Sequence, residues 1–275
     1  MISMRISRDC SCPNIAEQKC FFTFRHRICP SGENAMIMRL LLVFLLMATG
    51  LANSVPAQEE EYEDLWVLYI DEDYEKLVGK ALKITENDKT RKQAMPYLFV
   101  SMGYYEMSKR EEFSEDYPKA LKDAGKYAAR WRKKDKESKY VYDNKDFIAD
   151  LRAALMEEAE GYLEDEKISK AKGYYKYMVQ MDPENPGSWL AYAYAQKKMN
   201  DFSGSTESME MFEQKFGDIS KLDRDSQRLL KYALIVTSED LYREGKRTEA
   251  KEMIGRGADF FKEDREYSIV MEDLR

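Results

Sequence analysis

A hydrophobic pattern with helical spacing occurs twice in the middle of the chain, 34 residues apart. In the first copy, Leu155, Ala159 and Tyr162 are spaced by four and three residues. After a polar break, the spacing resumes at Ala171 and Tyr175. The second copy continues these registers with Trp189, Ala193, Ser205 and Met209. Each copy therefore predicts two amphipathic helices joined by a tight turn, with the large ring of Trp189 in the core.

These positions resemble the signature of the tetratricopeptide repeat (TPR) family, and of its exported bacterial members in particular. The family pattern, about 34 residues long, consists of a large residue, a small one, an aromatic, a small one, an aromatic and a closing proline. In this chain the six places are filled, in order, by Leu155, Ala159, Tyr162, Ala171, Tyr175 and Pro183. The resemblance implies an all-α fold, a right-handed superhelical stack of helical hairpins known as an α-solenoid.

Less regular helical spacing predicts further helices on both sides of the two repeats. In chain order we expect helices over 64–70, 74–86, from Pro96 onward, over 117–131 and over 145–163. After the repeats we expect a hairpin over 234–254 and a capping helix over 263–275. The repeat domain then covers 58–275 with about five hairpins, of which the clearest lie at 152–216.

The pattern before residue 58 differs and is typical of a signal for export. Arg39 precedes a short apolar run over 40–48, and Val55-Pro56-Ala57 offers small residues to a signal peptidase. The run is short for a bilayer span, so we interpret 36–57 as a signal peptide cleaved after Ala57, with an uncleaved anchor as the alternative. The mature protein would then be periplasmic or extracellular, with no integral membrane span.

A signal peptide begins at its own methionine, and we therefore interpret residues 1–35 as a mis-assigned, disordered upstream extension. All four cysteines and the single histidine lie there. The spacing C-x-C-x7-C-x8-C matches no familiar zinc pattern, although a Cys-rich metal site is the alternative. Without Cys or His, the mature chain can have no Ser-His-Asp triad, cysteine nucleophile, His-ligated metal or disulfide. We expect no metal and no cofactor.

Composition agrees with helices and disfavours nucleic-acid binding. The chain is 44% hydrophobic and 35% charged, with 13 Gly and 7 Pro, which is too few for a turn-rich β-sandwich. Its formal net charge is -7, whereas a nucleic-acid binder normally has a basic excess. The basic cluster over 130–134, which contains Trp131, is a weak candidate for holding a phosphate or an acidic partner.

In the TPR family the first helix of each hairpin lines a concave groove, so the resemblance implies a non-catalytic scaffold for a protein or peptide partner. The implied groove residues are Tyr97, Val100, Tyr104, Glu160, Leu190, Tyr194, Lys197, Lys198 and Tyr242. Tyrosines supply contact area with a polar handle, although such residues can also pack between helices. The alternatives are a structural subunit of an envelope complex and a glycan-acting enzyme that uses two carboxylates across a cleft.

Overall fold

Apolar side chains at helical spacing are buried throughout the computed structural model, which describes residues 62–274. Every regular element in these residues is a helix and none is a strand, which confirms the expected all-α class. The helices all belong to one compact unit, Glu59–Arg275. The expected upstream extension over 1–35 and the expected signal peptide over 36–57 lie outside the described residues.

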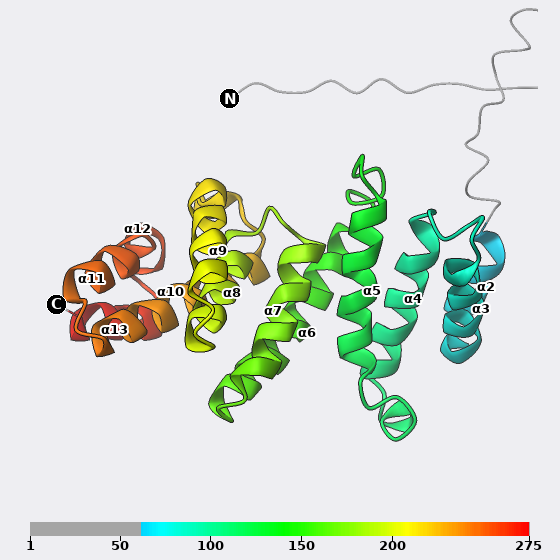
Figure 1. Cartoon of the computed structure of the whole chain (residues 1–275), viewed down its shortest axis with the longest axis horizontal. Coiled ribbons are helices and arrows are strands. Elements are labelled where there is room, and N and C mark those ends of the chain that lie inside the picture. Colours follow the sequence, from blue (N-terminus) through cyan, green and yellow to red (C-terminus); the bar gives the residue numbers. More distant parts are fainter. Residues whose placement is uncertain (1–61, 275) are drawn as a thin grey trace, which may run out of the picture. The chain divides into compact units, whose positions relative to one another are not determined.

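The α-helices of the described region follow one another through short connections (Figure 1). Their bounds are α2 (Glu63–Ile70), α3 (Tyr74–Glu86), α4 (Met95–Ser108), α5 (Ala120–Lys134), α6 (Lys145–Glu164), α7 (Ile168–Met181), α8 (Pro186–Lys198), α9 (Phe202–Lys215), α10 (Arg224–Arg243), α11 (Arg247–Gly255), α12 (Ala258–Phe261) and α13 (Arg265–Asp273). Two 3-10 helices, η2 (Glu111–Phe113) and η3 (Ile219–Lys221), precede α5 and α10.

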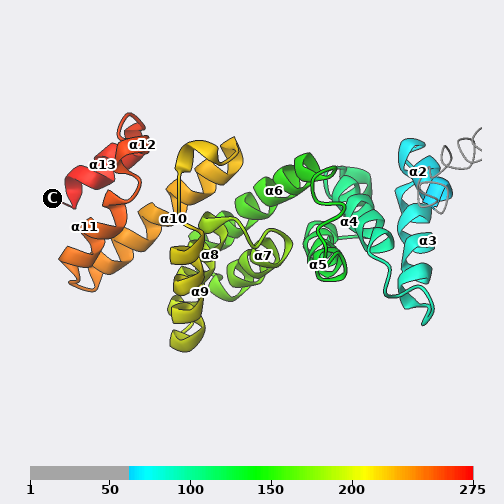
Figure 2. The same cartoon turned by 90° about the horizontal axis from the view of Figure 1, so that it is seen from above.

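Packing between helices follows the chain order. From α2 to α9, and again from α10 to α13, each helix contacts the next one. Helix α10 packs on α8 and also touches α6, as Figure 2 shows from above. Most of the core is therefore built between elements close in sequence. Helix α5 also packs on α7, and the contact of α10 with α6 joins elements further apart in the chain.

The expected 34-residue spacing is confirmed by the helix bounds. Helices α7 and α9 begin at residues 168 and 202 and end at residues 181 and 215, so both ends are offset by 34 residues. The small residues expected between paired helices are buried, with Ala159 and Ala171 at 0% exposure and Ala193 at 1%. Helix α3 has the bounds expected from the sequence.

The helices differ from the expectations in three places. Helix α10 begins at residue 224, before the start expected for the hairpin at 234, and helix α5 covers 120–134 instead of 117–131. Tyr117 lies outside it because the following residue, Pro118, disfavours helical geometry at the position before it. The short helix α12 had no counterpart in the expected pattern.

Trp189 is also placed differently from the expected core position. Its neighbour Leu190 is fully buried, whereas Trp189 is partly exposed. The indole N–H of Trp189 donates to the carbonyl oxygen of Pro183 at 2.8 Å. Two adjacent apolar residues point about 100° apart on a helix, so the pattern alone did not decide which one faces the core.

Four connections end their first helix with the same backbone turn. The residue two before the second helix has a positive φ, between 58° and 81°, in each case: Glu72, Glu166, Asn200 and Gly245. The N–H of the residue after it donates to a carbonyl five residues earlier, at 2.7 to 3.0 Å. This bond is the Schellman ending, which satisfies carbonyls left free at a helix C-terminus. The connection between α4 and α5 differs because it is longer and contains η2.

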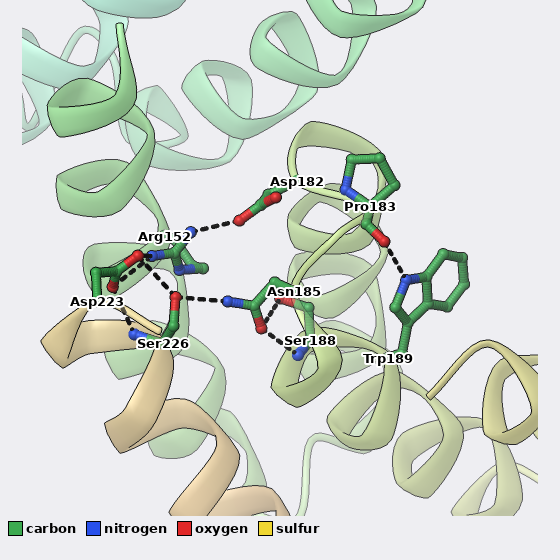
Figure 3. A network of polar contacts seen from close by, with 8 residues as sticks. All are labelled: Arg152, Asp182, Pro183, Asn185, Ser188, Trp189, Asp223 and Ser226. Carbon is green, nitrogen blue, oxygen red and sulfur yellow. Dashed lines mark hydrogen bonds and ion pairs between the residues drawn. The ribbon is translucent and has the colours of Figure 1, made fainter. Parts of the chain in front are cut away.

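A buried arginine joins three helices around the start of α8 (Figure 3). The Arg152 side chain, on α6, is 2% exposed, and its guanidinium lies 2.6 Å from Asp182 and 2.8 Å from Asp223. Asp223 also caps α10 by accepting from the N–H of Ser226 at 2.8 Å. Asn185 caps α8 and donates to the Ser226 hydroxyl at 2.7 Å. The network therefore fixes the starts of α8 and α10 against α6.

The two carboxylates on Arg152 differ in their electrostatics. Burial raises the pKa of Asp182, and the attraction of Arg152 only partly offsets this effect. Burial acts in the same direction on Asp223, but there the N–H of Ser226 and the charge of Arg152 outweigh it, so the pKa is lowered. The Asp223 carboxylate is thus the better stabilised anion of the two.

Replacing glycine by alanine should change the free energy of unfolding in opposite directions inside and outside the recurring turn. Gly245→Ala should destabilise the fold by about 1–2 kcal/mol, because an L-residue is strained at positive φ. Gly79→Ala, inside α3, should stabilise it by about 0.5–1 kcal/mol, because its added Cβ meets open space. Urea unfolding measures both changes. Shifts of the same sign would contradict this account of the turn.

Loss of the buried guanidinium should be far more damaging than loss of a surface one. Arg152→Ala should cost about 3 kcal/mol, the lower end for a broken buried pair, because the Asp223 side chain is 53% exposed. Arg243→Ala is the control, since Arg243 pairs with Glu239 at the surface and should change stability by less than about 0.5 kcal/mol. Equal urea midpoints for the two variants would contradict the role given to Arg152.

Candidate partner-binding surface

Three of the expected groove residues belong to the core instead. Val100 and Leu190 are 0% exposed and Tyr97 is 7% exposed, so they offer almost no area to a partner, although Tyr97 contributes to the lining of a hollow beside Arg130 and Lys134. In α4, residues 96–103 are all buried because α3 and α5 pack on either side of the helix. A first helix enclosed in this way has no free face along that stretch, and the assignment of these three residues to a groove was wrong.

Lys197 and Lys198 are present at the end of α8, but their charges are neutralised within the chain. Both contact Asp240 of α10, at 3.0 and 2.9 Å, and Lys197 also lies 2.7 Å from Glu244. The Asp240 side chain is 5% exposed. Burial alone would raise its pKa, but hydrogen bonds from the two lysines outweigh burial and lower it. These lysines therefore join α8 to α10.

The remaining four expected residues retain some exposed surface. Glu160 lies 3.5 Å from Arg228, and burial raises its pKa. Tyr104 and Tyr194 are half-buried, and Tyr242 is 37% exposed. The three tyrosines lie on α4, α8 and α10, and their role as partner contacts stays a prediction.

A second surface concentrates positive charge. Helix α5 carries cations at positions 126, 130, 133 and 134, a spacing that places them on one side of the helix. The structure adds cations from α7 and from the connections before α4 and after α5. We call this set the basic surface; its members are Lys92, Lys126, Arg130, Arg132, Lys133, Lys134, Lys136 and Lys176.

The basic surface lines two adjoining hollows that share Arg130 and Lys133. Their volumes are about 550 Å³ and 690 Å³, and no described residue lining either of them is acidic. Lys126 pairs with Asp123 at 2.9 Å, and Arg132 lies 4.0 Å from Asp135. Within residues 62–274 the other six cations have no carboxylate within 4.0 Å, unlike the lysines at the end of α8.

Aromatic rings lie directly beside these cations. The Arg130 guanidinium and the Lys126 ammonium are each 5.0 Å from the ring centroid of Tyr127. The Tyr127 ring in turn lies 6.5 Å from Tyr97 and 6.0 Å from Tyr104, two of the expected groove residues. Cation–π attraction holds the charged groups over the rings without neutralising them.

The hollow between α5 and α7 has an apolar floor and a charged rim. We call it the α5–α7 groove. Ala129 and Val179 are buried in the floor, and Pro183 and Trp189 complete it. Its rim is formed by Lys126, Arg130, Arg132, Lys133 and Lys176.

Sequence reasoning identified only the part of this surface that is contiguous in the chain. The cluster over 130–134 was evident, and the helical spacing of Lys126 from Arg130 could have extended it. Lys92, Lys176 and the Trp189 ring come from other elements, and only the packing of α5 on α4 and α7 brings them together. No pattern local to one segment could have indicated that packing.

No protein-family model matches this chain, and no curated protein or solved structure is significantly similar to it. None of the described helices is long and apolar enough to cross a membrane. Residues 62–274 also contain no group of three or more His, Cys, Asp or Glu side chains placed to hold a metal ion. The function is therefore argued from the contacts and charges described above.

The contact of Asp240 with two lysines predicts a pH-dependent contribution to stability. Because its pKa is lowered in the folded chain, the ionised carboxylate stabilises the fold. The contribution is complete above the pKa of an unfolded aspartate, about 3.9, and is lost as the pH falls through the lower folded value. Asp240→Asn should thus destabilise at pH 7 and approach the wild type as the pH is lowered below about 4. A urea-unfolding difference that stays constant from pH 7 to pH 3 would contradict this assignment.

Proposed function

We propose that this protein is a non-catalytic scaffold that binds a partner protein or peptide, and that the partner is acidic where it meets the basic surface. The observation that carries the proposal is the group of six cations without a carboxylate partner in residues 62–274, on a chain of net charge -7. Two of the six, Arg130 and Lys134, lie over tyrosine rings. Opposite charge on a partner steers association and specifies the partner.

The helix dipole of α5 explains the position of only some of these cations. Lys133 and Lys134 lie in the last turn of α5, where a cation is favoured by the helix dipole. That effect does not extend to Lys92 or Lys176, which lie outside α5. Like charges four residues apart on a helix, such as Arg130 and Lys134, repel each other. A surface that retains this repulsion without carboxylates is better explained by a partner that supplies them.

The proposed architecture is a TPR-like, right-handed superhelical stack of about five hairpins. It is supported by the 34-residue offset of α7 and α9, by the turn that recurs in four connections, and by the packing of helices in chain order. Repeats that contact mainly their neighbours form extended surfaces suited to binding proteins. The half-exposed Tyr104, Tyr194 and Tyr242 on first helices are a further contact surface in this proposal.

The proposed location is outside the cytoplasm, in the periplasm or the extracellular space of a bacterium. It is supported by the signal-like pattern over 36–57, which lies outside the described residues. No nucleic acid and no cofactor are part of the proposal.

Charge reversal on the basic surface tests the proposed function. Partners are captured from an envelope extract with the wild type and with two double variants, then identified by mass spectrometry. We expect Arg130→Glu with Lys133→Glu to reduce the recovery of the specific partner at least about tenfold, a loss on the order of 1.4 kcal/mol. The matched control is Lys83→Glu with Lys262→Glu, two exposed cations away from both hollows that change the net charge equally.

The control variant should retain the partner, and high salt should release it from the wild type, because attraction between exposed charges is screened. Unfolding curves show whether both variants remain folded. A partner retained equally by both double variants would contradict the role of the basic surface.

A further inference from the structure

The floor of the α5–α7 groove is rigid and apolar. The one polar atom of the Trp189 side chain, its indole nitrogen, is already bonded to the Pro183 carbonyl at 2.8 Å. The ring is only partly exposed, so that bond and its neighbours hold it in place. The segment that carries Pro183 and Trp189 is fixed at Asp182 by Arg152 and at Asn185 by the α8 cap, as Figure 3 shows. An apolar surface that includes the hydrogen-bonded Trp189 ring is thus available to a ligand.

Both helices that line the groove contribute cations to it. Lys126, Arg130 and Lys133 extend from α5, and Lys176 extends from α7, which packs beside α5. No described residue that lines the groove is acidic, and Gln180 in its lining is a neutral amide. The groove volume, about 550 Å³, is within the range of about 300–1,000 Å³ usual for ligand sites.

This combination restricts the kind of ligand. A polyanion such as a nucleic acid or a sulfated glycan would meet the rim but would leave the apolar floor uncovered. A neutral amphipathic helix would cover the floor but would leave the rim charges unmatched. Carboxylates on either side of an apolar side chain satisfy both parts, since burial of an apolar side chain is itself favourable.

We propose that the α5–α7 groove binds an acidic peptide segment with an apolar anchor, whose side chain packs on Trp189 while flanking carboxylates contact Lys126, Arg130, Lys133 and Lys176. The proposal rests on the proposed function, and it adds the class of ligand and the part of the basic surface that recognises it. It also gives Trp189 a role in recognition, which its partial exposure permits and a core position would not.

The test uses the full chain and two fluorescein-labelled peptides of matched charge, measured by fluorescence anisotropy. The anchored peptide alternates glutamates with two central leucines, and the anchorless peptide has serines in place of those leucines. The anchored peptide should bind about tenfold more tightly, as expected for burial of one leucine side chain. Trp189→Ala should reduce this preference to within about twofold, and Trp189→Phe should retain most of it.

Charge-reversal variants separate this inference from the proposed function. Arg130→Glu with Lys133→Glu should weaken the binding of both peptides at least about tenfold, whereas Lys83→Glu with Lys262→Glu should leave both unchanged. Equal affinity for the two peptides, with no effect of Trp189→Ala, would overturn the anchor while the acidic-partner proposal stands. Failure of both peptides to bind, or binding unaffected by charge reversal in the groove, would overturn both proposals.

A polyanion provides the remaining comparison. Heparin and a single-stranded oligonucleotide should compete with the anchored peptide only weakly, because neither covers the apolar floor. If either binds more tightly than the anchored peptide and Trp189→Ala does not change its affinity, the groove is a polyanion site and the peptide assignment is wrong. Thermal unfolding of Trp189→Ala shows whether a lost preference reflects the groove or a lost fold.

Discussion

The contact of Arg152 with two carboxylates is the interaction on which the C-terminal half of the described structure depends. Its guanidinium bonds Asp182, 30 residues later, and Asp223, 71 residues later. A buried cation is costly unless its partners are well placed, and here three hydrogen bonds of 2.6 to 2.9 Å meet it. These bonds place α10 across both α6 and α8.

Close contact between α8 and α10 needs a second condition, the absence of a side chain at Gly187. A Cβ there would lie 2.7 Å from the backbone nitrogen of Leu230, closer than real Cβ atoms approach. The residues around Arg152 thus set the position of α8 at its first turn, where Trp189 also lies. The same contacts therefore hold the Trp189 side of the α5–α7 groove and the packing of α10 on α6 and α8.

The sequence was sufficient for elements whose cause is local. Helix type, the 34-residue offset and the break before Pro183 follow from spacing and from proline geometry. It was insufficient for adjacent apolar residues such as Trp189 and Leu190, because the pattern does not show which of the two faces the core. It was also insufficient for a helix that is packed on both sides, as α4 is at Val100. The ion pairs of Lys197 and Lys198 were not evident for a related reason, since Asp240 contacts them from another helix. Candidate sites depend on such tertiary contacts far more than helices do.

The bond between Arg152 and Asp223 also limits how a chain of this kind can change in length during evolution. Stacked repeats readily gain or lose units, because each contacts mainly its neighbours. A further unit inserted between α7 and α10 would displace Asp223 and leave the 2% exposed Arg152 with one carboxylate fewer. A unit added after α11 would leave the ion pair intact. An insertion of helices is therefore tolerated more readily after α11 than between α7 and α10, where one ion pair fixes the length of the chain.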